Sequence, residues 1–88
     1  MLSRDKEIKN KLGLHARAAA QLVQTANRFA SEFFIKSGKT RVNGKSIMGV
    51  LMLAAVKGTT LTLEVAGTDE AGMMESLCAL FDNKFGEE

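Results

Sequence analysis

The only histidine of the chain, His15, lies in the segment LGLHARAAAQLV (12–23), two residues before Arg17. A helical pattern of apolar residues begins directly after it, so we expect the imidazole at or next to a helix N-terminus. The first backbone N–H groups of a helix lack intrahelical partners, and with the helix dipole they favour an anion there. Arg17 would add a second positive contact. The pattern therefore predicts a histidine that carries a phosphoryl group.

Other roles for a lone histidine have less support. The commonest is purely structural, as a partly exposed surface residue or a core residue. A zinc site would need a second histidine or a cysteine nearby, and a Ser-His-Asp triad would need a serine tied to His15. The segment GKTRVNGKS (38–46) fails the phosphate-binding-loop spacing by one residue. We therefore expect no metal, no cofactor and no enzyme activity, and a partner protein that completes the transfer.

The elements that must position His15 follow from hydrophobic periodicity. We predict strands at 2–9 and 59–66, a strand hairpin within 31–44, and helices at 16–27, 47–53 and 70–84. The first helix should bury one stripe: Ala19, Leu22, Val23, Ala26 and Ala30. The last helix should pack through another: Ala71, Met74, Cys78, Phe81 and Phe85. This order, β-α-β-β-α-β-α, predicts an α+β fold with an antiparallel sheet.

Local signals mark how these elements begin. Gly13 allows a sharp backbone turn before His15, and the small residues Ala16 and 18–20 should leave the approach open for a partner. Ser46 precedes an apolar helical run, and Thr68 precedes the last helix; both are N-cap signals.

Composition limits the class of protein. With 88 residues the chain is expected to form one domain spanning 1–88. A net charge of +2 is too balanced for a nucleic-acid-binding surface. Cys78 alone excludes a disulfide within the chain. The longest apolar run, 47–56, is too short to cross a bilayer, and the N-terminus lacks a signal-peptide pattern, so we expect a cytoplasmic protein.

Two motifs together resemble a known family. GLHAR followed by small residues, with NGKSIMGVLML about thirty residues later, is similar to HPr, the histidine-containing phosphocarrier of the bacterial phosphotransferase system. The resemblance extends through KGTTLTLEV to the final LFDNKF. It implies an open-faced β-sandwich with three helices over one face of a four-stranded antiparallel sheet. One departure is Ala18, where the family usually has proline; alanine is itself a good helix former.

The resemblance also implies partners and roles. His15 would take a phosphoryl group on Nδ1 from phospho-enzyme I and pass it to a histidine of an EIIA domain, while Arg17 steadies the phosphate. HPr kinase/phosphorylase would phosphorylate Ser46. The protein is expected to be a monomer. Its expected partner surface combines Arg17 with Ala16, Ala20, Ile47, Met48 and Leu51.

Two alternatives stay open. The first is a carrier of a regulatory, nitrogen-related branch, similar to NPr. The second is a small RNA-binding module, which would need aromatic residues on central strands for base stacking. We expect Phe33 and Phe34 to lie on opposite faces of their strand, which argues against the second. The basic residues near the hairpin should form a solvated face: Lys36, Lys39, Arg41 and Lys45.

Overall fold

The computed structural model describes residues 1–87; Glu88, the last residue of the expected domain, lies outside them. The predicted element order is confirmed. Along the chain the elements are β1 (Leu2–Glu7), α1 (Ala16–Ala26), β2 (Glu32–Ser37), β3 (Thr40–Asn43), α2 (Ile47–Met52), β4 (Thr60–Ala66), α3 (Glu70–Asp82) and a short 3-10 helix, η1 (Lys84–Gly86).

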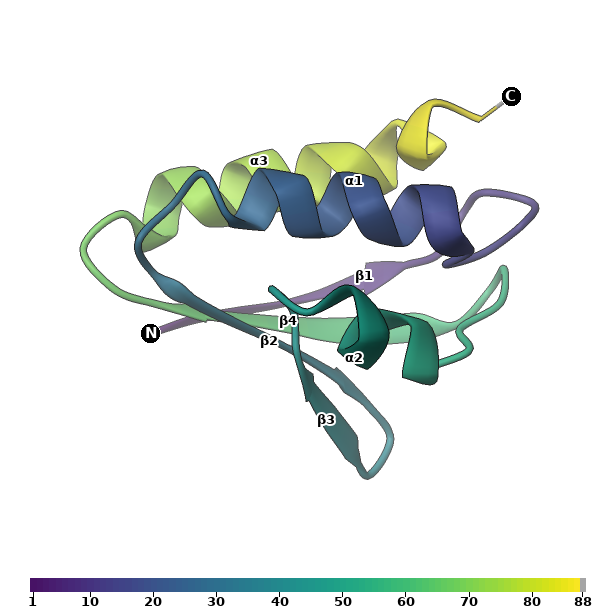
Figure 1. The fold of residues 1–88 in the computed structure, drawn as a ribbon, viewed down its shortest axis with the longest axis horizontal. Helices are drawn as coiled ribbons and strands as arrows, with labels where there is room; N and C mark the ends of the chain where they lie inside the picture. The colour runs from purple at the N-terminus through teal and green to yellow at the C-terminus, as the bar shows by residue number, and fades with distance from the viewer. Residues whose placement is uncertain (88) are drawn as a thin grey trace.

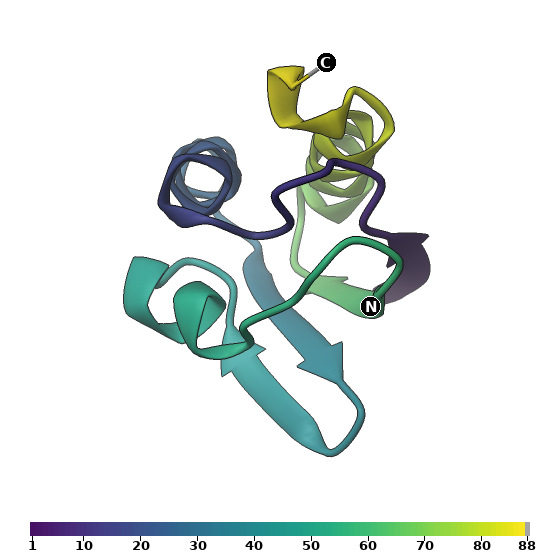
Figure 2. The ribbon, with the colours of Figure 1, turned by 90° about the vertical axis from the view of Figure 1, so that its right-hand side faces the viewer.

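The strands form one antiparallel sheet in the order β1-β4-β2-β3, with β4 between β1 and β2. The helices cover one face of this sheet and leave the other face open (Figure 1 and Figure 2). This is the open-faced sandwich that the sequence resemblance implied. Alternation along β4 explains the one-sided cover, because Leu61, Leu63 and Val65 are buried while Thr60 and Thr62 face away from the helices. Within residues 1–87 no helix has the length and apolar character needed to cross a membrane.

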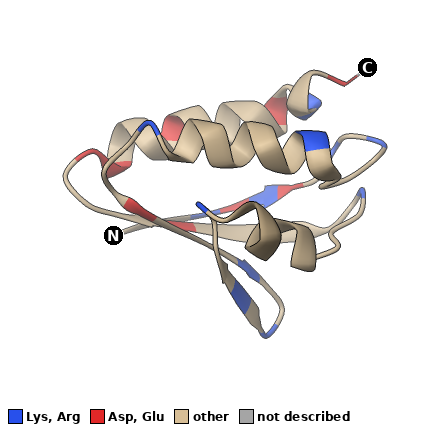
Figure 3. Cartoon of the chain, viewed as in Figure 1, with Lys and Arg blue, Asp and Glu red and all other residues tan. Residues whose placement is uncertain are grey.

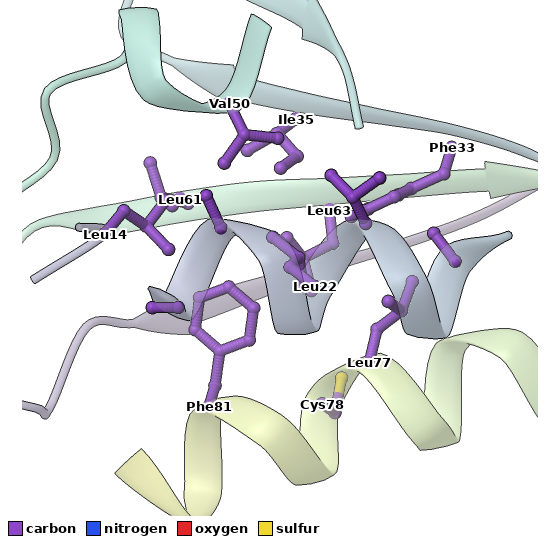
Figure 4. Close-up of a cluster of buried hydrophobic side chains, with 14 of the residues drawn as sticks. Leu14, Leu22, Phe33, Ile35, Val50, Leu61, Leu63, Leu77, Cys78 and Phe81 are labelled. Atoms are coloured by element: carbon purple, nitrogen blue, oxygen red, sulfur yellow. The ribbon is translucent and has the colours of Figure 1, made fainter. Parts of the chain in front are cut away.

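The core lies between the sheet and the helices α1 and α3. Figure 4 shows side chains from these helices and from the sheet meeting in one cluster, with Leu22 of α1 near its centre. The predicted α1 stripe is confirmed except at Ala30, which is exposed and lies beyond the helix end. Ala18, which lies outside that stripe, is buried as well. The prediction that four small residues line the approach to His15 is therefore wrong for Ala18 and Ala19, whereas Ala16 is exposed and Ala20 is half-buried.

The start of α3 differs from the prediction. Helix α3 begins at Glu70, but its N-cap position is Asp69 and not Thr68. The Asp69 carboxylate does not cap its own helix; it accepts hydrogen bonds from the amides of Ala30 and Ser31 and from the Ser31 hydroxyl. These donors, the hydroxyl foremost, hold the pKa of Asp69 below its ordinary value. Asp69 thus ties the α1–β2 turn to the start of α3.

The end of α3 also differs. The helix stops at Asp82 and not at residue 84, because Lys84 and Phe85 adopt positive φ angles of 54° and 53°. This left-handed turn sends the chain back, and Phe85 reaches the core through it, with its ring centroid 5.0 Å from that of Phe81. Ala71 is exposed, and the buried face of α3 is instead formed by Met73, Met74, Leu77, Cys78 and Phe81.

Candidate functional site

His15 occupies the N-cap position of α1, as predicted from the sequence. Its backbone is extended, with φ −77° and ψ 177°, and its Nδ1 accepts a hydrogen bond from the amide of Arg17 at 3.3 Å. Its Nε2 lies 2.8 Å from Oε2 of Glu87. These partners assign the tautomer: Nε2 carries the proton that it donates to the carboxylate, and Nδ1 keeps its lone pair. With 28% of the side chain exposed, the ring is neither buried nor turned from the helix amides.

A glycine fixes the path of the chain into this site. Gly13 has φ +68°, and a Cβ there would lie 2.5 Å from the carbonyl oxygen of Ala55. The same carbonyl accepts a hydrogen bond from the amide of Leu14 at 2.9 Å, and the Leu14 side chain is buried. The prediction that Gly13 allows a sharp turn is confirmed. The hydrogen bond between Leu14 and Ala55 also joins the turn to the segment after α2, so His15 lies beside that segment.

Along the chain, Arg17 is the basic residue nearest to His15. It is exposed in the first turn of α1 and is the only charged residue of that helix. Figure 3 shows this basic position at the N-terminal end of α1, whereas α2 carries no charged residue. The positive end of α1 and the Arg17 amide therefore lie on the Nδ1 side of the ring, and the guanidinium adds a positive charge to the same helix turn.

Glu87 is a site residue that the sequence analysis missed. Its Oε2 accepts hydrogen bonds from His15 and from Nδ2 of Asn10, the latter at 2.7 Å, and its Oε1 accepts one from the amide of Leu12 at 3.2 Å. Against the opposing effect of partial burial, these bonds hold the pKa of Glu87 below its ordinary value, the one from Asn10 foremost. No local pattern could reveal the contact, because 72 positions separate Glu87 from His15.

Ser46 caps α2, as predicted. Its hydroxyl accepts a hydrogen bond from the amide of Gly49 at 3.2 Å, and its side chain remains partly accessible. Helix α2 packs beside α1 (Figure 1 and Figure 2), so Ser46 lies at the start of the helix that neighbours the His15 helix.

Exposed apolar side chains gather on α2 and the neighbouring loops. Met48 and Met52 have 71% and 76% of their surface accessible. We call the following exposed residues the apolar rim: Leu12, Ile47, Met48, Met52 and Val56. Of these, Ile47 and Met48 were predicted from the sequence and the other three were not. Of the remaining expected partner residues, Ala16 is exposed, while Ala20 is half-buried and Leu51 packs partly against the core.

The four basic residues near the hairpin were predicted to form one solvated face, but the side chains of only two of them are free of tertiary contacts among the described residues. Lys36 and Lys39 are exposed, but Arg41 stacks on the Phe34 ring at 3.9 Å and pairs with Glu64 at 2.9 Å. Lys45 donates a hydrogen bond to the carbonyl of Phe29, so it belongs to a tertiary contact and not to a solvated face.

The two neighbouring aromatic residues of β2 lie on opposite faces of the sheet, as predicted. Phe33 is buried in the core, and the Phe34 ring on the open face is covered by Arg41. Neither ring therefore offers a free stacking surface to a nucleic-acid base.

Comparison with known proteins identifies the family. The sequence profile PTS-HPr, described as the PTS HPr component phosphorylation site, matches residues 2–83. This chain belongs to the HPr family. The phosphocarrier protein HPr of Neisseria meningitidis serogroup A is 54% identical to it over 87 residues, covering 99% of this chain and 98% of that protein. Its fold matches the crystal structure of an HPr from Thermoanaerobacter tengcongensis with a TM-score of 0.96 at 44% identity, covering 100% of this chain and 99% of the other.

Membership of the HPr family makes the chain a phosphocarrier of the phosphotransferase system and not an enzyme. A phosphocarrier protein NPr from Shewanella violacea is also similar, with 43% identity over 98% of this chain and 94% of that protein. The higher identity to the Neisseria HPr favours the HPr assignment over the NPr-like alternative.

Proposed function

We propose that His15 is the phosphoryl acceptor of this HPr-family carrier and that its Nδ1 forms the bond to phosphorus. The observation that carries the proposal is the position of Nδ1, unprotonated and 3.3 Å from the first-turn amide of Arg17. A phosphoryl group bound there meets the positive end of α1, and the exposed guanidinium of Arg17 steadies its oxygens. The site holds the phosphate without enclosing it, which suits a carrier that must release its cargo.

The donor is phospho-enzyme I, charged from phosphoenolpyruvate, and the acceptor is a histidine of an EIIA domain in the cytoplasm. In the first step the Nδ1 lone pair attacks phosphorus, and the electron pair of the broken bond stays on the donor. In the second step a nitrogen lone pair of the EIIA histidine attacks phosphorus, the bond between Nδ1 and phosphorus breaks, and its electron pair returns to Nδ1. The chain has few groups to catalyse either step, so each partner must supply the remaining electrostatic stabilisation.

The docking surface for both partners is the apolar rim together with Ala16, Ala20 and Leu51 beside the His15 loop. Exposed apolar groups of this kind mark interaction sites, and flexible methionines such as Met48 and Met52 adapt to unlike surfaces. Each partner would cover the rim while its own reactive histidine faces His15. The protein acts as a monomer in these complexes.

The acceptor assay tests this function and its branch. Purified protein is incubated with enzyme I and phosphoenolpyruvate, and the phosphorylated form is offered to a sugar-specific EIIA and to its nitrogen-branch counterpart. We expect one acid-labile, base-stable label per chain and faster transfer to the sugar-specific domain. Faster transfer to the nitrogen-branch domain would instead support the NPr-like alternative, and absence of any label would exclude the carrier role.

We propose that Ser46 is a regulatory phosphorylation site for HPr kinase/phosphorylase. A phosphate of about −2 charge at the start of α2 is locally favourable because it meets the first amides of the helix. It would also place an anion beside the apolar rim, where Ile47 and Met48 must meet enzyme I. Repulsion and lost apolar contact would then slow phosphoryl uptake by His15.

Replacing Ser46 with aspartate should slow phosphoryl uptake from enzyme I by about tenfold, through weaker association. Aspartate is as good an N-cap as serine, so α2 is retained and the effect reports charge. The measurement is the initial rate of labelling at several concentrations of the carrier. The control is Ser3→Asp, which adds the same charge at an exposed residue of β1. Equal rates for S46D, S3D and the wild type would leave Ser46 as a simple cap.

A further inference from the structure

We propose that Glu87 is a positioning residue for His15 and that Asn10 holds it in place. This inference rests on the proposed role of His15 as the phosphoryl acceptor. Glu87 contacts the ring nitrogen opposite the one that would be phosphorylated: Nε2 lies 2.8 Å from Oε2 of Glu87. The side chains of His15 and Glu87 are 28% and 19% exposed, so water is partly excluded from their contact.

The cluster is built from donors that converge on one carboxylate. Asn10 and His15 donate to Oε2, and the amide of Leu12 donates to Oε1. Both oxygens of Glu87 are therefore acceptors, and a side-chain amide at this position would turn an NH2 group towards a donor. The cluster requires a carboxylate and would not be satisfied equally by the isosteric glutamine.

The side chain of Asn10 is buried and donates two hydrogen bonds within this cluster. It is 1% exposed, and its Nδ2 also donates to the carbonyl of Gly13 at 2.7 Å. Its Oδ1 has no hydrogen-bond partner among residues 1–87. Burying an unpaired carbonyl oxygen is unfavourable, so the contacts of Nδ2 with Glu87 and Gly13 must compensate for it. Asn10 thereby joins the turn before His15 to the C-terminal segment.

That segment is itself anchored, so the carboxylate is held in place. Phe85 is buried, and its carbonyl accepts a hydrogen bond from Nε2 of Gln21 on α1 at 3.0 Å. The left-handed turn at Lys84 and Phe85 then directs the chain back towards α1. Two residues beyond this anchor, Glu87 meets the His15 ring.

The contact matters to both phosphoryl-transfer steps. When Nδ1 binds phosphorus, the proton stays on Nε2 and the ring becomes a cation. When the bond breaks, the electron pair returns to Nδ1 and the ring leaves as neutral imidazole with Nε2 still protonated. Loss of the Nε2 proton beforehand would force the ring to leave as an anion, a much poorer leaving group. Glu87 favours the productive form by accepting the Nε2 proton in a hydrogen bond throughout.

The hydrogen bond, and not a net electrostatic attraction, is therefore the main contribution of Glu87. Its carboxylate contacts the cationic ring at 2.8 Å, whereas a phosphoryl group on Nδ1 would lie across the ring from it. A phosphate carries about −2 charge and Coulomb energy falls inversely with separation, so its repulsion at about twice the distance offsets much of the attraction to the ring. Within α1 and α2, Arg17 is the only charged residue, and its charge favours the phosphate.

The test uses Glu87→Gln and Glu87→Ala, with Glu75→Gln as a matched control at an exposed glutamate of α3. The first readout is the 15N spectrum of the His15 ring in the unphosphorylated protein. The second is the rate of labelling by phosphoramidate, a small phosphoryl donor that needs no partner protein. Unfolding midpoints in urea verify that each variant is folded.

We expect wild type and E75Q to show one tautomer with the proton on Nε2, and E87Q and E87A to show a mixture. Labelling should be about tenfold slower in both Glu87 variants, which corresponds to a barrier about 1.4 kcal/mol higher. A single Nε2–H tautomer with an unchanged labelling rate in folded E87A would overturn the inference, as would a changed tautomer with an unchanged rate. Failure of enzyme I to label a wild type that phosphoramidate labels would count against the proposed function alone.

Discussion

Replacing His15 with alanine is expected to abolish phosphorylation by enzyme I, reducing the label to background. The reason is chemical, because no other side chain at the N-terminus of α1 offers a nucleophilic nitrogen with a free lone pair. The guanidinium of Arg17 offers no free lone pair, and the neighbouring residues of the first turn are alanines. The measurement is incorporation of labelled phosphate from phosphoenolpyruvate, scored for acid lability.

The alanine variant also removes the N-cap hydrogen bond to the amide of Arg17, which is worth about 1 kcal/mol in a typical helix. His15→Asn is therefore the matched variant, because asparagine is a preferred N-cap residue but lacks the imidazole nucleophile. We expect H15N to keep the wild-type unfolding midpoint more closely than H15A and to remain unlabelled. Acid-labile label in folded H15N at the wild-type level would refute the assignment of the acceptor.

Replacing Phe81 with alanine is expected to lower the free energy of unfolding by about 3–5 kcal/mol. The Phe81 ring is fully buried between α3 and the rest of the core (Figure 4). It packs edge-on against the ring of Phe85. Its loss leaves a cavity and also removes the support of Phe85, the anchor of the C-terminal segment. The measurement is urea unfolding at 25 °C, followed by circular dichroism.

Phe34→Ala is the matched control for this change. The Phe34 ring is half-buried on the open face of the sheet, where its main contact is Arg41 at 3.9 Å. Such a contact contributes only about 0.5–1 kcal/mol at an exposed site, so we expect a much smaller loss of stability. Equal losses in F81A and F34A would show that the core is not centred between α3 and the sheet. Because Phe85 positions Glu87, F81A should also broaden the ring signals of His15.

The amino-acid sequence by itself determined the element order, the placement of His15 at the start of α1 and the cap at Ser46. These features depend on short-range patterns. The period of apolar residues distinguishes α1 from β4, a residue with a side-chain acceptor precedes each of α1 and α2, and Gly13 supplies the positive φ that the turn requires. The two family motifs could be identified from the sequence for the same reason, because each motif is a short continuous segment.

Only the tertiary structure decided which distant groups meet. Glu87 reaches His15 because a left-handed turn redirects the chain after α3, and Asp69 is recruited by the α1–β2 turn in place of its own helix. Ala18 is buried because the packing of α1 beside α2 and α3 turns this position towards the core. Such contacts depend on how packed elements place residues far apart in the chain, and neither periodicity nor capping signals contain that information.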